Sequence, residues 1–163
     1  MSNNWLMQIP NNIGYYLAGF ADGEGSLNVS LRNKKDYTRN WQVCPCFNVS
    51  QKDITILALF KRYLECGNIK KRKDGLFMYE VNNYSMLKER VIPFFKKYPF
   101  ISSSKEENFS LFCQILAIMN GDHLTEQGFR KIIDLREKLN EGKGRKRKYR
   151  KQEIFGESPE TIR

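Results

Sequence analysis

Two carboxylates separated by a glycine, Asp22 and Glu24, form the part of this sequence best suited to chemistry. They lie in residues 17–26, which read Leu-Ala-Gly-Phe-Ala-Asp-Gly-Glu-Gly-Ser, and Gly23 and Gly25 permit tight turns around them. Carboxylate and backbone carbonyl oxygens are ligands that Mg²⁺ prefers in proteins. The segment can therefore hold Mg²⁺ at Glu24. The alternative is a simple helix end, which is the commoner role of an acidic, glycine-rich turn.

Polar side chains alternate with apolar ones in two later segments, residues 26–32 and 41–50. A period of two is typical of strands with one buried and one exposed face, and the charged residues 33–40 between them indicate a long hairpin. The exposed face carries donors and acceptors suited to base edges and phosphates, and an antiparallel ribbon is narrow enough to enter a DNA major groove. A sheet face that is merely solvated is the alternative.

Helices and two more strands are expected to position these residues. The pattern predicts a helix over residues 13–21 with an asparagine cap, and a second helix over residues 53–65 that ends before Gly67. Strands at residues 69–72 and 77–81 flank an Asp74-Gly75 turn and form a second hairpin.

The second half of the chain is expected to be helical. The predicted helices lie near residues 85–91, after Pro93, over residues 105–120 with a Ser104–Glu107 capping box, and over residues 126–140. The element order predicts a mixed α/β (α+β) fold in which helices cover one face of a four-stranded antiparallel sheet.

Composition favours a polyanionic partner. The 163 residues include 28 Lys and Arg against 18 Asp and Glu, a formal net charge of +10, which points to nucleic acid. Four cysteines without a C-x-x-C pair and a single histidine exclude a repeated zinc finger and indicate reduced thiols. No apolar run approaches a membrane span, and the first 13 residues lack the basic residues of a signal or transit peptide.

Residues 17–26 closely resemble the LAGLIDADG motif of intron-encoded homing endonucleases, and residues 47–52, Phe-Asn-Val-Ser-Gln-Lys, resemble the end of that family's second strand. The resemblance covers about residues 14–140. It implies the family's α-β-β-α-β-β-α fold with a four-stranded antiparallel DNA-binding sheet. A single motif further implies a homodimer, as in the members encoded in chloroplast ribosomal-RNA introns.

The activity implied by this resemblance is hydrolysis of both strands of a long, nearly palindromic double-stranded DNA site. Glu24 would bind the metal with help from the Gly23 carbonyl, Gln51 would position the attacking water, and Lys105 would stabilise the developing charge. Lys96 and Lys97 are the alternatives to Lys105. Mg²⁺ is the implied cofactor. Mn²⁺ or Ca²⁺ can occupy the same site, Ca²⁺ without supporting turnover.

The resemblance also implies two kinds of interface. Two motif helices would meet across a twofold axis, where small residues let backbones approach closely. The expected dimer residues are Leu17, Ala18, Gly19, Ala21 and Asp22. The expected DNA contacts are Asn28, Ser30, Arg32, Lys34, Tyr37, Gln42, Cys44, Asn48, Lys70, Arg72, Lys143 and Arg145.

The chain is divided by composition into an endonuclease domain at residues 1–142 and a basic tail at residues 143–163. Seven of the nine residues 143–151 are basic, which predicts phosphate contacts; a disordered, solubilising tail is the alternative.

Two other functions remain open. An intron-RNA maturase or a cleavage-deficient DNA-binding protein would keep the same fold. A basic, ribosome-associated RNA-binding protein would need aromatic residues on the exposed sheet face, whereas Trp41 and Phe47 belong to the core side of their strand. The expected location is an organelle, chloroplast ahead of mitochondrion, and neither a membrane nor a small-molecule substrate is expected as a partner.

Overall fold

The computed structural model of this chain describes residues 4–37, 39–141 and 147–156. One antiparallel sheet contains the strands in the order β1-β2-β4-β3. The strands are β1 (Gly25–Asn33), β2 (Trp41–Gln51), β3 (Asn68–Lys71) and β4 (Phe77–Val81). The mixed α/β fold and the four-stranded antiparallel sheet expected from the sequence are confirmed.

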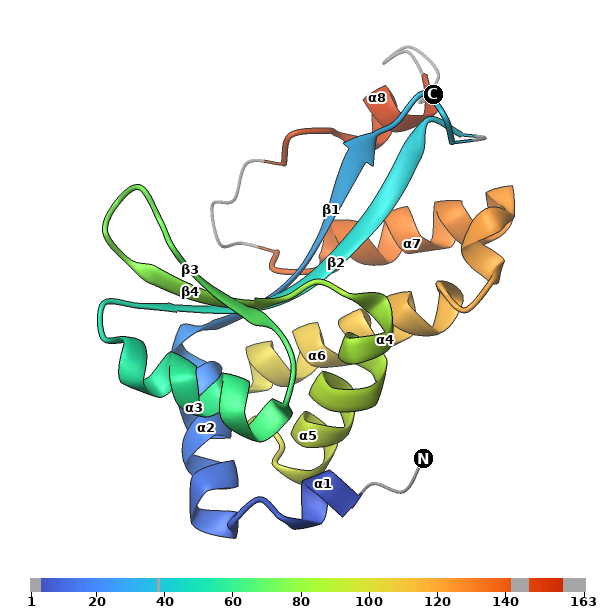
Figure 1. Ribbon diagram of the computed structural model, residues 1–163. Coiled ribbons are helices and arrows are strands. Elements are labelled where there is room, and N and C mark those ends of the chain that lie inside the picture. The colour runs from blue at the N-terminus through green and yellow to red at the C-terminus, as the bar shows by residue number, and fades with distance from the viewer. Residues whose placement is uncertain (1–3, 38, 142–146, 157–163) are drawn as a thin grey trace.

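Helices gather on one side of this curved sheet (Figure 1). Those in the described ranges are α1 (Asn4–Met7), α2 (Asn11–Glu24), α3 (Ile54–Leu64), α4 (Tyr84–Met86), α5 (Ile92–Lys97), α6 (Ser103–Ile118), α7 (Glu126–Lys138) and α8 (Lys151–Phe155). A π-helical turn, Leu87–Val91, joins α4 to α5 without a break, so the two helices expected around Pro93 form one continuous run. A 3₁₀ turn, Asp122–Leu124, precedes α7.

The register of the first hairpin separates polar from apolar residues as the alternation predicts. Arg32 lies opposite Gln42, and the pairs Ser30–Cys44, Asn28–Cys46 and Ser26–Asn48 follow on the same face. The opposite face carries the pairs Leu31–Val43 and Leu27–Phe47. Strand β4 pairs with β2 only from Phe47 to Gln51, so residues 41–46 of β2 and their partners 28–33 of β1 form a two-stranded arm.

Aromatic side chains dominate the core between sheet and helices. Phe47, Phe60, Tyr79 and Phe95 are each at most 1% exposed, and the rings of Phe60 and Tyr79 stack with centroids 5.8 Å apart. The Tyr79 hydroxyl donates to the Cys66 carbonyl at 3.0 Å, and burial raises the pKa of Tyr79. This core attaches α3 and α5 to the sheet.

Several helix ends differ from those predicted. Helix α2 continues through the acidic pair to Glu24, and β1 begins at the next residue. Gly25 allows this direct passage, because a Cβ there would lie 2.6 Å from the Ala21 carbonyl oxygen. Pro10 is the N-cap of α2, without a side-chain cap, so the predicted asparagine cap is not formed.

Helix α6 begins at Ser103, two residues before its predicted start, and its N-cap Ser102 makes no side-chain cap hydrogen bond. The Ser104–Glu107 capping box is therefore wrong. Helix α7 begins at the predicted residue, where the Thr125 side chain accepts a hydrogen bond from the Gly128 N–H.

A smaller apolar cluster covers the core side of the two-stranded arm. Its buried members are Leu31, Phe129, Ile133 and Ile154, so residues from the basic C-terminal stretch contribute to the folded unit. All four cysteines are free thiols, as expected. Among the described helices, each is too short or too polar to cross a membrane.

Candidate active site and nucleic-acid interface

Glu24 is the last residue of α2 and its side chain is exposed. The carboxyl end of a helix carries partial negative charge, because its last carbonyls have no partners within the helix. A carboxylate at this end is electrostatically unfavourable unless a cation is nearby. Both the Glu24 carboxylate and the carboxyl end of α2 therefore attract a cation to this position.

Asp22 serves a different purpose. Its carboxylate accepts hydrogen bonds from the backbone N–H groups of Ile101 and Ser102, both at 3.0 Å, and from the Ser102 hydroxyl. Burial raises the pKa of this carboxyl, but the hydrogen bonds from Ser102 and Ile101 and the charge of Lys105 outweigh it and leave the pKa below its usual value. Asp22 therefore connects the residues just before α6 to α2.

Lys105 lies beside the same junction. It is 6% exposed, and its ammonium donates a hydrogen bond to the carbonyl of Gly25, the residue after Glu24. The alternative Lys97 instead donates to the Leu6 carbonyl at 2.9 Å, beside α1. Of the described candidates, Lys105 is the lysine that the fold brings to the carboxyl end of α2.

Gln51 stands at the same end of the sheet. Gly25 pairs with Val49, so Gln51, two residues further along β2, lies next to the end of α2. Its side-chain oxygen accepts a hydrogen bond from the Lys52 N–H at 2.8 Å. The three residues expected to be catalytic are thus gathered at one corner of the folded chain.

The described residues of this chain provide only part of a metal shell. Among the described residues, no three His, Cys, Asp or Glu side chains approach one another closely enough to hold a metal ion. The hard donors at this corner are the Glu24 carboxylate and the carbonyls of the last helical turn, including that of Gly23. These donors fit a Mg²⁺ ion, but only as part of a shell that other groups complete.

The expected dimer residues divide between two environments. Leu17, Ala18 and Ala21 are at most 3% exposed and pack into the core of the chain itself, so these side chains offer almost no surface to a second copy. Gly19 is exposed, and a Cβ added there would meet no atom within 4 Å. The small and apolar residues of α2 pack this helix against the sheet of the same chain. The periodicity of a sequence alone does not distinguish such packing from packing against another chain.

The described residues expected to contact DNA lie on the polar face of the sheet, except Lys34 and Tyr37 between β1 and β2 and Arg72 just after β3. Ser30, Arg32, Lys34, Tyr37, Lys70 and Arg72 are exposed, and Gln42, Cys44 and Asn48 are partly buried. Asn28 is only 8% exposed and offers little surface to a ligand. Burial raises the pKa of the Cys44 thiol, which makes it a neutral contact.

An acidic residue on this face was missed. Glu80 pairs with Lys70 at 2.8 Å, and Arg72 bonds Asp74 at 2.8 Å and the Ser50 hydroxyl at 3.3 Å. Both side chains of the Arg72–Asp74 pair are exposed, and such pairs contribute little to stability, whereas Glu80 is only 17% exposed. The register that places Glu80 opposite Asn48 could be found only once β4 was known to pair with β2.

A cavity of about 650 Å³ opens along the free edge of the arm, lined in part by Arg32, Arg39 and Gln42. Within the described chain, two buried side-chain atoms lack hydrogen-bond partners, Gln42 Oε1 and His123 Nδ1, and both residues line this cavity. A buried acceptor without a partner is costly, and a ligand donor or a side-chain rearrangement would relieve it.

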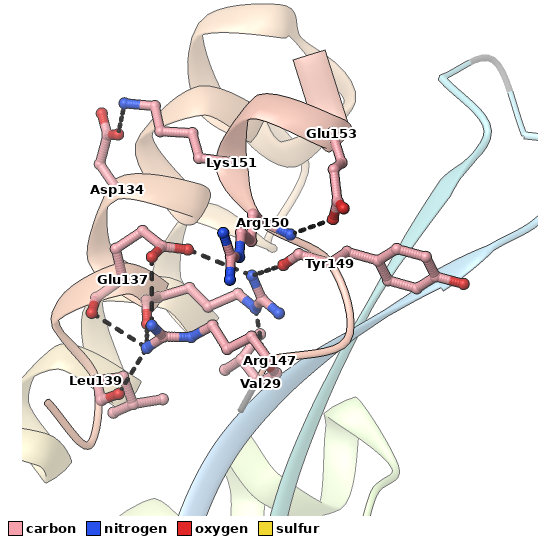
Figure 2. A network of polar contacts seen from close by, with 10 residues as sticks. Val29, Asp134, Glu137, Leu139, Arg147, Tyr149, Arg150, Lys151 and Glu153 are labelled. Carbon is pink, nitrogen blue, oxygen red and sulfur yellow. Dashed lines mark hydrogen bonds and ion pairs between the residues drawn. The ribbon is translucent and has the colours of Figure 1, made fainter. Parts of the chain in front are cut away.

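The basic tail is only partly described. Lys143 and Arg145 lie outside the described residues. Arg147 and Lys151, from the same basic run, contact α7 (Figure 2): Arg147 bonds Glu137, and Lys151 pairs with Asp134 at 2.6 Å. These two cations are used within the fold.

Comparison with known proteins agrees with this geometry. Residues 17–116 match the family model described as LAGLIDADG endonuclease. A "Probable intron-encoded endonuclease 2" from Neurospora crassa is 31% identical over 132 residues, which are 78% of this chain but 29% of that protein. DNA endonuclease I-CeuI from Chlamydomonas moewusii is 28% identical over 146 residues, 85% of this chain and 67% of that protein.

Solved structures give the same result. The crystal structure of the homing endonuclease I-TnaI superimposes with a TM-score of 0.74 at 32% identity, covering 79% of this chain and 88% of that one. Meganuclease I-SmaMI bound to uncleavable DNA gives a TM-score of 0.76 at 33% identity, covering 83% of this chain and 46% of that one. The chain thus spans less than half of some relatives and most of others.

Proposed function

The chain belongs to the LAGLIDADG endonuclease family, and from that premise we propose that it is a homing endonuclease that cuts both strands of a long, nearly palindromic DNA site as a homodimer. The observation that carries the proposal is the corner where exposed Glu24 adjoins the buried ammonium of Lys105. One such corner supplies half of what double-strand cleavage needs, and a second copy supplies the other half.

The proposed dimer contact is the outer face of α2. Asn12, Tyr16, Gly19 and Gly23 are exposed and recur at helical spacing, and Tyr16 is 51% exposed. A Cβ at Gly19 or Gly23 would meet no atom within 4 Å, so both glycines leave room for the backbone of a second helix. Contact along this face would bring the two Glu24 side chains together at the carboxyl ends of the paired helices.

Two Glu24 carboxylates at such a seam repel each other, and divalent cations shared with DNA phosphates relieve that repulsion. The proposed ion is Mg²⁺, which when bound polarises the scissile phosphate and lowers the pKa of water. Glu24 holds the ion, with the Gly23 carbonyl as a second oxygen donor.

The other two residues act on the substrate and the water. The ammonium of Lys105 is shielded from solvent, which strengthens its attraction for the charge that develops on the phosphate. The Gln51 side chain is proposed to orient the attacking water through hydrogen bonds, since its amide can both donate and accept.

Recognition of the site is proposed to depend on the polar sheet face. A half-site of about ten base pairs spans about 34 Å, and the 11 residues of β2 extend about 36 Å. Arg32 suits guanine, while Gln42 and Asn48 suit purine edges. Lys34 and Tyr37 near the hairpin tip would reach the outer pairs, and Lys70 and Arg72 would reach phosphates or guanines.

The host gene is proposed to lie in an intron of an organelle genome, since relatives such as the Neurospora crassa protein are named as intron-encoded. An intron-RNA maturase or a cleavage-deficient DNA-binding protein remains the alternative with the same fold. The exposed Glu24 favours cleavage, because neither alternative needs an acidic residue beside the phosphates.

The deciding experiment incubates the purified chain with Mg²⁺ and a library of intron-less ribosomal-RNA gene fragments. Double-strand cleavage of one fragment is expected, with binding but no cleavage in Ca²⁺. Binding to intron RNA without cleavage of any DNA in the library would contradict the proposal and favour the maturase.

A further inference from the structure

The two-stranded arm of the sheet needs a support of its own. Over residues 41–46, β2 pairs only with β1, and a two-stranded ribbon is marginally stable in water by itself. This arm carries Arg32 and Gln42, both proposed to read bases. The residues that pack against the core side of the arm therefore determine the positions of the Arg32 and Gln42 side chains.

Part of that cover comes from residues 147–156, here called the C-terminal segment. Ile154 is 8% exposed and belongs to the apolar cluster that contains Leu31 of β1. The ring of Tyr149 meets that of Trp41, the first residue of β2, edge-on with centroids 4.7 Å apart. Phe155 packs against Phe129 of α7 with ring centroids 5.8 Å apart.

A buried guanidinium joins the C-terminal segment to β1. Arg136 of α7 is 4% exposed, and it donates to the Val29 carbonyl at 3.0 Å and to the Tyr149 carbonyl at 3.4 Å. A buried charge is strongly destabilising when its partners are removed, so this group holds both carbonyls in place. One side chain thus fixes β1 and the C-terminal segment to the same helix.

Arg147 fixes the beginning of the C-terminal segment to the end of α7. Its guanidinium donates to the carbonyls of Glu137 at 3.1 Å and Leu139 at 2.9 Å and to that of Arg136 (Figure 2). These carbonyls lie at the carboxyl end of α7, where the partial negative charge of the helix favours a cation. Arg147 therefore caps the carboxyl end of α7, and its guanidinium is unsuited to a phosphate contact.

The ion pairs of the C-terminal segment contribute less. Lys151 and Asp134 are 45% and 55% exposed, and exposed pairs are worth little in water. The apolar contacts of Tyr149 and Ile154 and the buried Arg136 hydrogen bonds are the interactions that hold this segment against the arm.

We propose that the C-terminal segment is a positioning element for the arm, and that Tyr149 and Ile154 set specificity at the outer base pairs of each half-site without touching DNA. The specificity part rests on the proposed function. Arg32 lies seven residues from Gly25 along β1, about 23 Å from the cleavage corner, so movement of the arm affects outer pairs and spares inner ones.

The test compares Tyr149→Ala and Ile154→Ala with Gln152→Ala, an exposed control in the same segment. Without DNA, amide hydrogen exchange at Leu31 and Val43 should rise about tenfold or more in the first two variants and stay unchanged in the control. On a library of substituted half-sites, discrimination should fall about tenfold at outer pairs and remain at inner pairs. Ile154→Val, a smaller truncation that keeps the fold, should show a weaker effect in the same direction.

Three results overturn the proposal. Unchanged exchange in the arm would show that the segment does not support it. Faster exchange with unchanged outer-pair discrimination would remove the link to specificity. Uniform loss of affinity with a reduced salt dependence would mean that the segment contacts phosphates directly. If the parent chain binds no DNA site, the proposed function fails, and the exchange measurement alone decides the positioning role.

Discussion

The ammonium of Lys105, at the start of α6, donates a hydrogen bond to the backbone carbonyl of Gly25, 80 residues earlier in the chain. The bond crosses the junction where α2 becomes β1, directly beside Glu24. Asp22 connects the same two helices from the other side through Ser102. Motif carboxylate and lysine are therefore held as one unit, and displacement of α6 would disturb both.

Replacing the exposed carboxylate tests the metal assignment. Glu24→Gln should reduce Mg²⁺-dependent cleavage about 100-fold or more, because a neutral amide is a poor ligand for a hard cation. Site binding should stay nearly intact, since the sheet contacts are unchanged. Cleavage and gel-shift assays measure the two effects separately. Glu107→Gln, the same substitution at an exposed position of α6, should cut normally. Full cleavage by the Glu24 variant would refute the assignment.

Removing the buried ammonium tests the role of Lys105. Lys105→Met should lower the cleavage rate about 100-fold to 1,000-fold, the effect seen when one charge-stabilising donor is lost. Site binding at saturating protein should remain. Lys96→Met is the matched control, because Lys96 is an exposed lysine on α5 and the remaining alternative. Loss of cleavage in the Lys96 variant alone would transfer the role to that residue.

Asp22→Ala should destabilise the fold by about 1 kcal/mol or more at pH 7, since a hydrogen bond contributes about 1 kcal/mol. The folded pKa of Asp22 lies below its usual value of 3.8, so the carboxylate contributes stability above about pH 3.8. That contribution is lost as the pH falls from there through the folded pKa. Urea unfolding at pH 7 and at pH 3 should give a smaller difference between variant and parent at the lower pH. Equal differences at both would contradict this ionic contribution.

Gly19→Leu should block dimerisation while leaving the protomer folded. The added side chain meets open space in the protomer, and leucine is a better helix former than glycine by about 1 kcal/mol. Sedimentation velocity without DNA should find monomers where the parent chain is dimeric, and double-strand cleavage should be lost. Ala58→Leu, at an exposed position of α3, should remain dimeric and active. A dimeric Gly19 variant would show that this face of α2 is not the interface.

Direct base readout is tested on the arm. Arg32→Ala or Gln42→Ala should reduce discrimination by about 1–3 kcal/mol at particular base pairs. Lys34→Ala, by contrast, should weaken binding evenly if it contacts a phosphate. Competition binding against singly substituted half-sites distinguishes the two patterns. An even loss for Arg32 and Gln42 would argue against direct readout.

The sequence by itself determined the strands, their faces and the family. Alternation over β1 and β2 is visible in the chain because a side-chain period of two follows from strand geometry, whatever the strand packs against. The motif at residues 17–26 is likewise local, and residues 17–116 match the family model. These features depend on neighbours in the chain, which the sequence displays directly.

Only the tertiary structure decided what depends on distant neighbours. The buried face of α2 was settled by the core around Leu17 and Ala21, which turned three expected interface residues inward and left Gly19 outside. The residue just before α6 is held by Asp22, about 80 residues away, so no capping pattern near Ser104 could reveal this contact. The C-terminal residues were predicted to be a basic tail because charge dominates their composition. In the structure, Ile154 belongs to a buried apolar cluster with residues of β1 and α7, which forms only when these three segments pack together. Packing between segments that are far apart in the chain cannot be predicted from the periodicity of any one segment.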